Sequence, residues 1–175
     1  MKILFIGPPG SGKSTQAKLL AEYLNLPYIS TGDIFRNLAQ EDHEEGKRIK
    51  QILDAGQLVD DETVIKLIKK KVAQTDCQNG FILDGYPRNL EQASKLTGVN
   101  FDKAFYLKLP KKEVLRRLLK RGRTDDTEES IRKRLDLYYQ QTQSLIDYYT
   151  SLGILVEIDA TRDIQTVQDE IKKFI

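Results

Sequence analysis

One glycine-rich stretch, GPPGSGKST at residues 7–15, restricts the possible folds of this chain more than any other feature. It matches the pattern G-x-x-x-x-G-K-[ST] at Gly7, Gly12, Lys13 and Ser14. An apolar run, KILFIG, precedes it, and a helical pattern of apolar residues follows it. A strand, a glycine-rich turn and a helix in this order are typical of a loop that binds the phosphates of a nucleotide.

The residue types in this loop suit that chemistry. Gly10 and Gly12 permit backbone angles that turn consecutive N–H groups toward one point. The start of the following helix adds partial positive charge, and Lys13 adds a full charge for the β and γ phosphates. The alternative is a chance glycine-rich turn, and the flanking strand and helix argue against it. We therefore expect a nucleoside triphosphate to contact Gly10, Ser11, Gly12, Lys13, Ser14 and Thr15.

The rest of the chain alternates strand-like and helix-like patterns, which predicts an α/β fold with a parallel sheet between layers of helices. Strands are expected at residues 2–7, 27–30, 80–84, 103–109 and 154–159. Helices are expected at residues 13–24, 31–40, 43–54, 61–75, 89–96, 111–121, 126–151 and 164–174. In the longest of these, Asp126 is the expected N-cap, with Glu129 in the capping-box position.

Composition argues against several classes of protein. Lys and Arg number 28 and Asp and Glu 26, so the net charge of +2 does not favour nucleic acid or a membrane surface as a partner. A single cysteine, Cys77, permits neither an intrachain disulfide nor a cysteine-based zinc site. No apolar run reaches the ~18 residues of a membrane span, and the start lacks a signal-peptide core. We expect one cytoplasmic domain.

Five further stretches indicate a family. ISTGDIFR (29–36), ILDAGQLVDDETV (52–64), GFILDGYPRNLEQA (80–93), RGRTDD (121–126) and RKR (132–134) follow the glycine-rich loop in order. Together they resemble the adenylate kinases among the nucleoside monophosphate kinases, over essentially the whole chain. The resemblance implies a P-loop three-layer α/β/α sandwich with a five-stranded parallel sheet. It also implies a monomer that catalyses ATP + AMP ⇌ 2 ADP, with Mg²⁺ carried by ATP.

The resemblance assigns an acceptor site. Arg36 and Arg88 would grip the phosphate of AMP, because a planar guanidinium can donate two hydrogen bonds to it. Thr31 and Gln92 would read the base, since a glutamine amide can pair with a ring nitrogen and an amino group of adenine. Taken singly, Thr31 is also suited to cap its helix, and the other three suit an exposed surface. The implied AMP site comprises Thr31, Gly32, Arg36, Gln57, Leu58, Val59, Gly85, Tyr86, Pro87, Arg88, Gln92, Arg123 and Arg134.

The same resemblance explains a concentration of arginines near residue 121. Arg121 and Arg123 would clamp the phosphates during transfer, and Arg134 would reach in from the longest helix, because the transferred group carries spread negative charge. Asp125 and Asp126 would orient the arginines. The implied catalytic residues are Lys13, Arg88, Arg121, Arg123 and Arg134.

Two more residues are assigned to ATP by resemblance. Arg117 would lie over the adenine as a cation–π contact, and Arg162 stands in the loop whose backbone meets the base. The ATP site would therefore add Arg117, Arg121 and Arg162 to the glycine-rich loop. For Arg116, Lys120, Arg132 and Lys133, we favour a solvated surface role.

A metal position follows from Asp84, which ends an apolar strand close to the loop. A carboxylate there suits Mg²⁺, most often through bound water. A capping role at the strand end is the alternative. Ser14 is a departure from the many adenylate kinases that have glycine there, and contact of its hydroxyl with Mg²⁺ stays open.

The implied organisation is a single domain of residues 1–175 with three parts. The core comprises residues 1–29, 60–119 and 127–175, an AMP-binding subdomain spans 30–59, and a minimal lid spans 120–126. Many adenylate kinases insert a lid between the arginines matched by Arg121 and Arg123, where this chain has only Gly122. Residues 30–59 are then expected to close over AMP.

Two rival functions stay open from the sequence. Kinases of UMP and CMP are similar, but tend to have a small residue at the position of Thr31 and Asn at that of Gln92. A non-catalytic nucleotide-binding regulator would usually lose catalytic charge, whereas Lys13, Asp84 and the arginines are all present.

Overall fold

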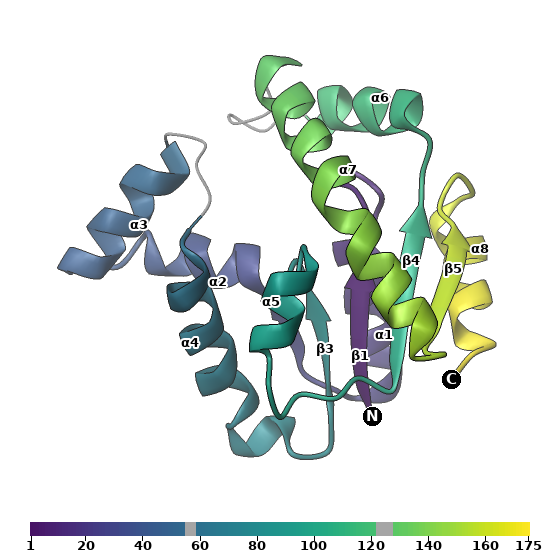
Figure 1. Cartoon of the computed structure of the whole chain (residues 1–175), viewed down its shortest axis with the longest axis horizontal. Coiled ribbons are helices and arrows are strands. Elements are labelled where there is room, and N and C mark those ends of the chain that lie inside the picture. The colour runs from purple at the N-terminus through teal and green to yellow at the C-terminus, as the bar shows by residue number, and fades with distance from the viewer. Residues whose placement is uncertain (55–58, 122–127) are drawn as a thin grey trace.

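The protein, described by a computed structural model, is built on a five-stranded, all-parallel sheet with the order β2-β3-β1-β4-β5 (Figure 1). The structure describes residues 1–54, 59–121 and 128–175, with the backbone alone for Arg121, Ser130 and Arg134. The strands are β1 (Lys2–Ile6), β2 (Tyr28–Ser30), β3 (Phe81–Asp84), β4 (Lys103–Lys108) and β5 (Leu155–Asp159). The helices are α1 (Lys13–Leu24), α2 (Thr31–Leu38), α3 (Glu44–Asp54), α4 (Asp61–Val72), α5 (Leu90–Lys95), α6 (Lys111–Arg121), α7 (Glu128–Ser151) and α8 (Ile164–Lys172), with a 3₁₀ turn η1 (Thr75–Cys77).

The central strands β1 and β3 are buried on both faces, which explains why they read as continuous apolar runs. Side chains of β1 alternate between two clusters, as the two-residue period of a strand requires. Ile3 and Phe5 pack with residues of α1 and α8, whereas Leu4 and Ile6 pack with residues of α4 and the C-terminal half of α7. The result is the expected three-layer α/β/α sandwich, and Figure 1 shows α7 crossing one face of it.

The register of the strands determines where the site forms. Phe5 of β1 and Ser30 of β2 both pair with Asp84, the last residue of β3. Since all strands are parallel, their carboxyl ends meet at one edge, where open α/β sheets place ligands. The glycine-rich loop after β1, the start of α2 after β2 and the turn after β3 are therefore neighbours.

Every expected strand and helix is present among the described residues, and most ends agree within one or two positions. The helix expected over residues 61–75 is wrong at its end, because α4 stops at Val72 and η1 follows it. Gln74 has an extended backbone, with ψ of 154°, and this interrupts the helical path. The expected cap Asp126 lies outside the described residues. Among the helices that the structure describes, none is long and apolar enough to cross a membrane.

Candidate active site

The glycine-rich loop joins β1 to α1 with the backbone that an anion site needs. Gly10 and Gly12 have φ of +80° and +92°, a left-handed region that favours glycine. Gly12 is the N-cap of α1 and supplies no side chain to the first-turn N–H groups, which are thus available to a ligand. A Cβ built on Gly12 meets nothing within 4 Å, so this side of the loop faces open space.

The loop is held in place by its neighbours. A Cβ on Gly10 would lie 2.9 Å from the Leu118 side chain, so only glycine lets the loop pack this closely on α6. Lys13 Nζ donates a 2.9 Å hydrogen bond to the carbonyl oxygen of Pro8, which folds the lysine back over the loop. Thr15 is exposed in the first turn of α1.

Asp84 is buried at the end of β3, with 3% of its surface exposed. Its Oδ2 accepts a 2.6 Å hydrogen bond from Ser14 Oγ and a 3.0 Å bond from the hydroxyl of Tyr28. Burial, together with the charge of Asp84, raises the pKa of Tyr28, so its hydroxyl stays protonated and donates. Within the described part of the chain, Oδ1 of Asp84 is buried and has no partner.

This arrangement fits Mg²⁺. A buried carboxylate oxygen without a partner is expensive unless a cation or water satisfies it. The described residues contain no group of three or more His, Cys, Asp or Glu side chains that could hold a metal. One carboxylate and one hydroxyl suit an ion that takes most of its ligands from phosphates and water, as Mg²⁺ does.

The acceptor side begins at α2, directly after β2. Ser30, not Thr31, is the N-cap of α2, and its hydroxyl accepts a 3.2 Å bond from Asp33 N. The capping role considered for Thr31 is therefore wrong, and its hydroxyl is not needed by the helix. Thr31 instead lies against Gly85, because a Cβ built on Gly85 would be 2.7 Å from Thr31 Oγ1.

Arg36 lies one turn further along α2. Its guanidinium pairs with Asp33 and passes over Gly32, where a built Cβ would come within 3.2 Å of it. Both partners of this ion pair are about half exposed, so the pair is weak and a phosphate can compete for the arginine.

Arg88 follows the turn after β3 and a cis peptide bond between Tyr86 and Pro87, two buried residues. Its Nε donates to the carbonyl oxygen of Gly85 at 2.9 Å. The side chain keeps contact with solvent, yet surrounding protein lowers its pKa by desolvation, opposed by the charges of Asp84 and Asp61. Since arginine stays protonated in proteins, Arg88 places a positive charge next to Gly85 and near Asp84.

Gln92 is buried in α5, with 8% of its surface exposed. Its Oε1 accepts a 2.7 Å bond from Arg88 N, and its Nε2 donates a 2.7 Å bond to Asp61 Oδ1. The surface role considered for Gln92 is therefore wrong.

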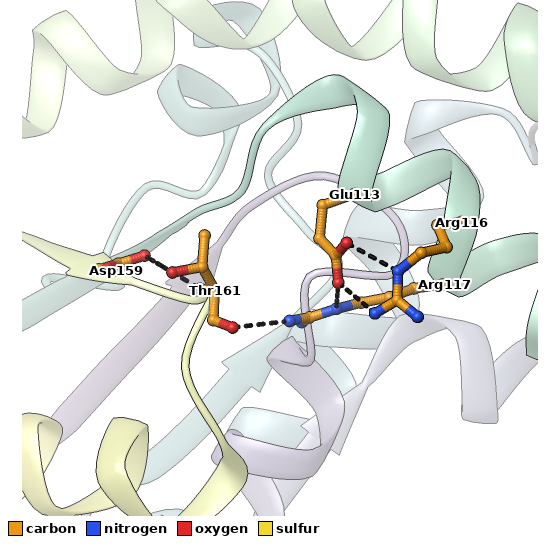
Figure 2. Close-up of polar contacts among 5 residues, drawn as sticks. All are labelled: Glu113, Arg116, Arg117, Asp159 and Thr161. Carbon is orange, nitrogen blue, oxygen red and sulfur yellow. Dashed lines mark hydrogen bonds and ion pairs between the residues drawn. The ribbon is translucent and has the colours of Figure 1, made fainter.

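Arg117 connects α6 to the loop after β5 (Figure 2). Its Nε donates to Glu113 Oε1 at 2.9 Å, and its Nη2 donates to the carbonyl oxygen of Thr161 at 3.3 Å. Glu113 also binds Arg116, and hydrogen bonds from Arg116 and Arg117 lower the pKa of Glu113 to about 2. The guanidinium of Arg117 therefore contacts the loop after β5, and the resemblance assigns both to the adenine of ATP.

The remaining cations fall into two groups. Arg162 pairs with Asp159 and Glu170, so its side chain points toward β5 and α8. Arg116, Arg132 and Lys133 are exposed and pair with carboxylates of their own helices, in agreement with a surface role. Lys120 is exposed as well.

A sequence model of the adenylate kinase family matches residues 5–154. The chain belongs to the adenylate kinase family. An adenylate kinase of Prochlorococcus marinus (strain MIT 9301) is 41% identical over 177 aligned residues, covering 98% of this chain and 96% of the relative. That of Mycobacteroides abscessus is 43% identical, covering 95% and 94%, and that of Archaeoglobus fulgidus is 37% identical, covering 100% and 98%.

Membership in the adenylate kinase family makes the chain a phosphotransferase that acts between ATP and AMP. Neither the family match nor the relatives favour a UMP or CMP kinase or a non-catalytic regulator.

Several residues assigned to the adenylate kinase site fall outside the described part of the chain. Val59 is described and buried. The following predicted positions lie outside it, in whole or as side chains: Gln57, Leu58, Arg121, Arg123, Asp125, Asp126 and Arg134.

The sequence motifs did not predict a role for four residues around this adenylate kinase site. They are Tyr28, Ser30, Asp61 and Glu113. A signal existed for Glu113, because a carboxylate four residues before Arg117 on a helix is a standard ion-pair spacing. Another existed for Ser30, which precedes a helical run and is a favoured N-cap residue. Tyr28 is 56 residues from its partner Asp84, and Asp61 is 31 residues from its partner Gln92. No local sequence pattern predicts contacts over such separations.

Proposed function

We propose that the described residues divide the reaction ATP + AMP ⇌ 2 ADP between two adjoining subsites. The glycine-rich loop with Lys13 binds the phosphates of ATP, and Thr31, Arg36, Arg88 and Gln92 bind AMP. One observation carries this division: Asp84 bonds to Ser14 of the donor loop, and the next residue, Gly85, lies against Thr31. Two polyanions bound at these places would meet end to end.

In the donor subsite, positive groups of the protein would face the negative charge of the triphosphate. The N–H groups at the start of α1 and the ammonium of Lys13 would hold the β and γ phosphates, once Lys13 exchanges its bond to Pro8 for a phosphate. Arg117 and the loop after β5 would hold the adenine between them.

A magnesium ion would be held next to this loop by Asp84 and Ser14, with water completing its shell. When bound, it supplies neutralisation of the phosphate charge and alignment of the γ phosphate. Ser14 and Tyr28 aim the carboxylate by binding Oδ2, which leaves Oδ1 to face the ion or its water.

In the acceptor subsite, Arg36 and Arg88 would orient the phosphate of AMP as the attacking group. Arg36 has to leave Asp33 to do so, and the exposure of both side chains keeps that exchange inexpensive. Orientation of two bound reactants removes much of the entropic barrier to transfer.

The arginines near residue 121 would act at the moment of transfer. The negative charge spread over the migrating phosphoryl group would be stabilised by Arg121, Arg123 and Arg134. Asp125 and Asp126 would hold these arginines in the required orientation. We propose residues 30–59 as the AMP-binding part and residues 120–126 as a minimal lid.

Further properties belong to the same proposal. We propose a cytoplasmic monomer that uses Mg²⁺ with ATP, holds no zinc, and acts on the small nucleotides ATP, AMP and ADP, with neither nucleic acid nor a membrane as partner. The near-neutral net charge of +2 supports the absence of nucleic acid and of an anionic membrane surface as partners.

A nucleotide panel tests the proposed function. ADP formation from ATP with AMP, UMP or CMP as acceptor should depend on Mg²⁺ and strongly favour AMP. If UMP or CMP were used as well as AMP or better, AMP would not be the preferred acceptor. If no phosphoryl group were transferred to any of the three, the assignment of both subsites would be wrong.

A further inference from the structure

The amide of Gln92 has both of its ends hydrogen-bonded to other residues of the chain. Its oxygen Oε1 accepts from the backbone N–H of Arg88, and its nitrogen Nε2 donates to Oδ1 of Asp61, each at 2.7 Å. Gln92 is also held at its backbone, where its N–H donates to Asn89 Oδ1 at 2.8 Å. The amide is thus bound from two elements, the start of α4 and the turn before α5.

These two partners determine which way the amide faces. An amide can usually rotate by half a turn and exchange its oxygen and nitrogen with little change in shape. Here rotation would place Oε1 against the Asp61 carboxylate, which can only accept, and Nε2 against the Arg88 N–H, which can only donate. Both hydrogen bonds would be lost, so the two contacts select the same orientation independently.

One donor and one acceptor remain on this amide. Nε2 has a second N–H, and Oε1 has a second lone pair. The Watson–Crick edge of adenine offers an acceptor at N1 and a donor at the 6-amino group, so it matches this pair. A 6-oxopurine offers the reverse pattern, a donor at N1–H and an acceptor at O6, so the same amide would face donor to donor and acceptor to acceptor.

We propose that Asp61 determines base specificity as a positioning residue, by keeping the Gln92 amide in the orientation that accepts adenine and rejects 6-oxopurines. The inference rests on the proposed role of Gln92 in the AMP subsite. Asp61 suits the task because it is the first residue of α4, directly after the N-cap Asp60, where the helix end favours its negative charge.

The test compares AMP with inosine monophosphate, which differs from AMP only at N1 and the 6-position of the base. The ratio of kcat/KM for the two acceptors should fall about tenfold in Asp61→Ala, the effect expected when one of two restraints on a buried amide is lost. Because both acceptors are measured on one sample, the ratio does not depend on how much of the variant is folded. Calorimetric binding of each monophosphate gives the same ratio without catalysis.

Two variants separate orientation from charge. Asp61→Asn loses the negative charge but its amide oxygen can still accept from Nε2, so it should keep most of the discrimination. Glu62→Ala removes a neighbouring charge from the same helical turn on an exposed side chain, and should leave the ratio unchanged. In a Gln92→Ala background, Asp61→Ala should no longer alter the ratio, because Asp61 acts through that amide.

Each result points in one direction. A ratio that falls in Asp61→Ala, but not in Glu62→Ala, supports the inference. Equal losses for both acceptors in Asp61→Ala, or the same change of ratio in Glu62→Ala, would overturn it while leaving AMP as the substrate. A wild-type protein that does not convert AMP would instead contradict the proposed function itself.

Discussion

The proposed donor and acceptor halves of this site are built in different ways. The donor loop is one continuous stretch of nine residues whose glycines and helix start direct N–H groups outward. The acceptor half is assembled from α2, the start of α4 and the turn between β3 and α5. Its polar side chains already have partners, since Arg36 pairs with Asp33 and Gln92 with Asp61. The comparison teaches that the proposed phosphate site is largely formed by backbone, whereas the proposed base site depends on side chains held by other side chains.

The largest effect is expected when a substitution removes one full positive charge from either half. Lys13→Ala and Arg88→Ala should each lower kcat by roughly 10³-fold or more, the scale seen when a phosphate-clamping cation is lost. A coupled assay of ADP formation measures this, and the fold should persist by circular dichroism. Arg132→Ala is the matched control, because Arg132 is exposed and pairs only with Glu128 among the contacts described for it. Losses below tenfold in both variants would mean that the two halves do not meet at the transferred phosphate.

A smaller effect tests how tightly the halves adjoin. Gly85→Ala places a Cβ 2.7 Å from Thr31 Oγ1 at a φ of +91°, so it combines a clash with about 1–2 kcal/mol of left-handed strain. We expect kcat/KM for AMP to fall by at least about tenfold, which acceptor kinetics at saturating ATP will measure. Gly98→Ala has a φ of +83° but open space around its Cβ, so it reproduces the strain alone. If both variants keep full AMP kinetics, close contact between Gly85 and Thr31 is not required.

A third prediction concerns the carboxylate that the two halves share. Tyr28→Phe removes one of the two hydrogen bonds to Asp84 Oδ2, a loss of about 1 kcal/mol for a typical bond. The Mg²⁺ concentration at half-maximal activity should rise by roughly fivefold, and Mn²⁺ binding to the ATP complex, followed by paramagnetic resonance, should weaken in parallel. Tyr23→Phe is the control, because Tyr23 is exposed. An unchanged metal requirement would leave Ser14 as the sole orienting partner.

The smallest expected effect lies at the base of ATP. Glu113→Gln loosens Arg117, and the KM for ATP should rise by roughly a few-fold at most, since the amide oxygen of glutamine can still accept from Arg117 and the pair remains partly exposed to solvent. The pKa of Glu113 is lowered from 4.5 to about 2, by Arg116 first and Arg117 second. Its contribution to the free energy of unfolding is therefore fully present above pH 4.5 and is lost as the pH falls through about 2.

Acid unfolding checks the sign of this last prediction. Between pH 5 and 2, the wild-type protein should lose stability more steeply than Glu113→Gln, whose amide does not titrate. Parallel pH profiles for the two proteins would show that the ion pair contributes nothing.

The sequence was sufficient for the order of strands and helices and for the donor loop. Each depends on residues that are close together in the chain: a two-residue or 3.6-residue apolar period, or a glycine spacing that only one backbone path satisfies. The family resemblance added the residues proposed to bind AMP, among them Thr31 and Gln92, for which no local pattern in the sequence gives a role in binding.

Errors arose where neighbouring signals competed. Thr31 and Ser30 are both favoured cap residues, but Ser30 has the extended backbone of an N-cap whereas Thr31 is already helical. Helix α4 ended earlier than its apolar period suggested, because the extended backbone of Gln74 redirects the chain into η1.

The sequence alone established a glycine-rich strand–loop–helix in an α/β fold of the adenylate kinase family, since these features depend on contiguous residues. What required the folded molecule is the pairing of those residues: Tyr28 with Asp84, and Asp61 with Gln92. The physical reason is that a parallel sheet brings strand ends together across long stretches of chain. A hydrogen bond formed there depends on register and packing, neither of which leaves a local pattern in the sequence.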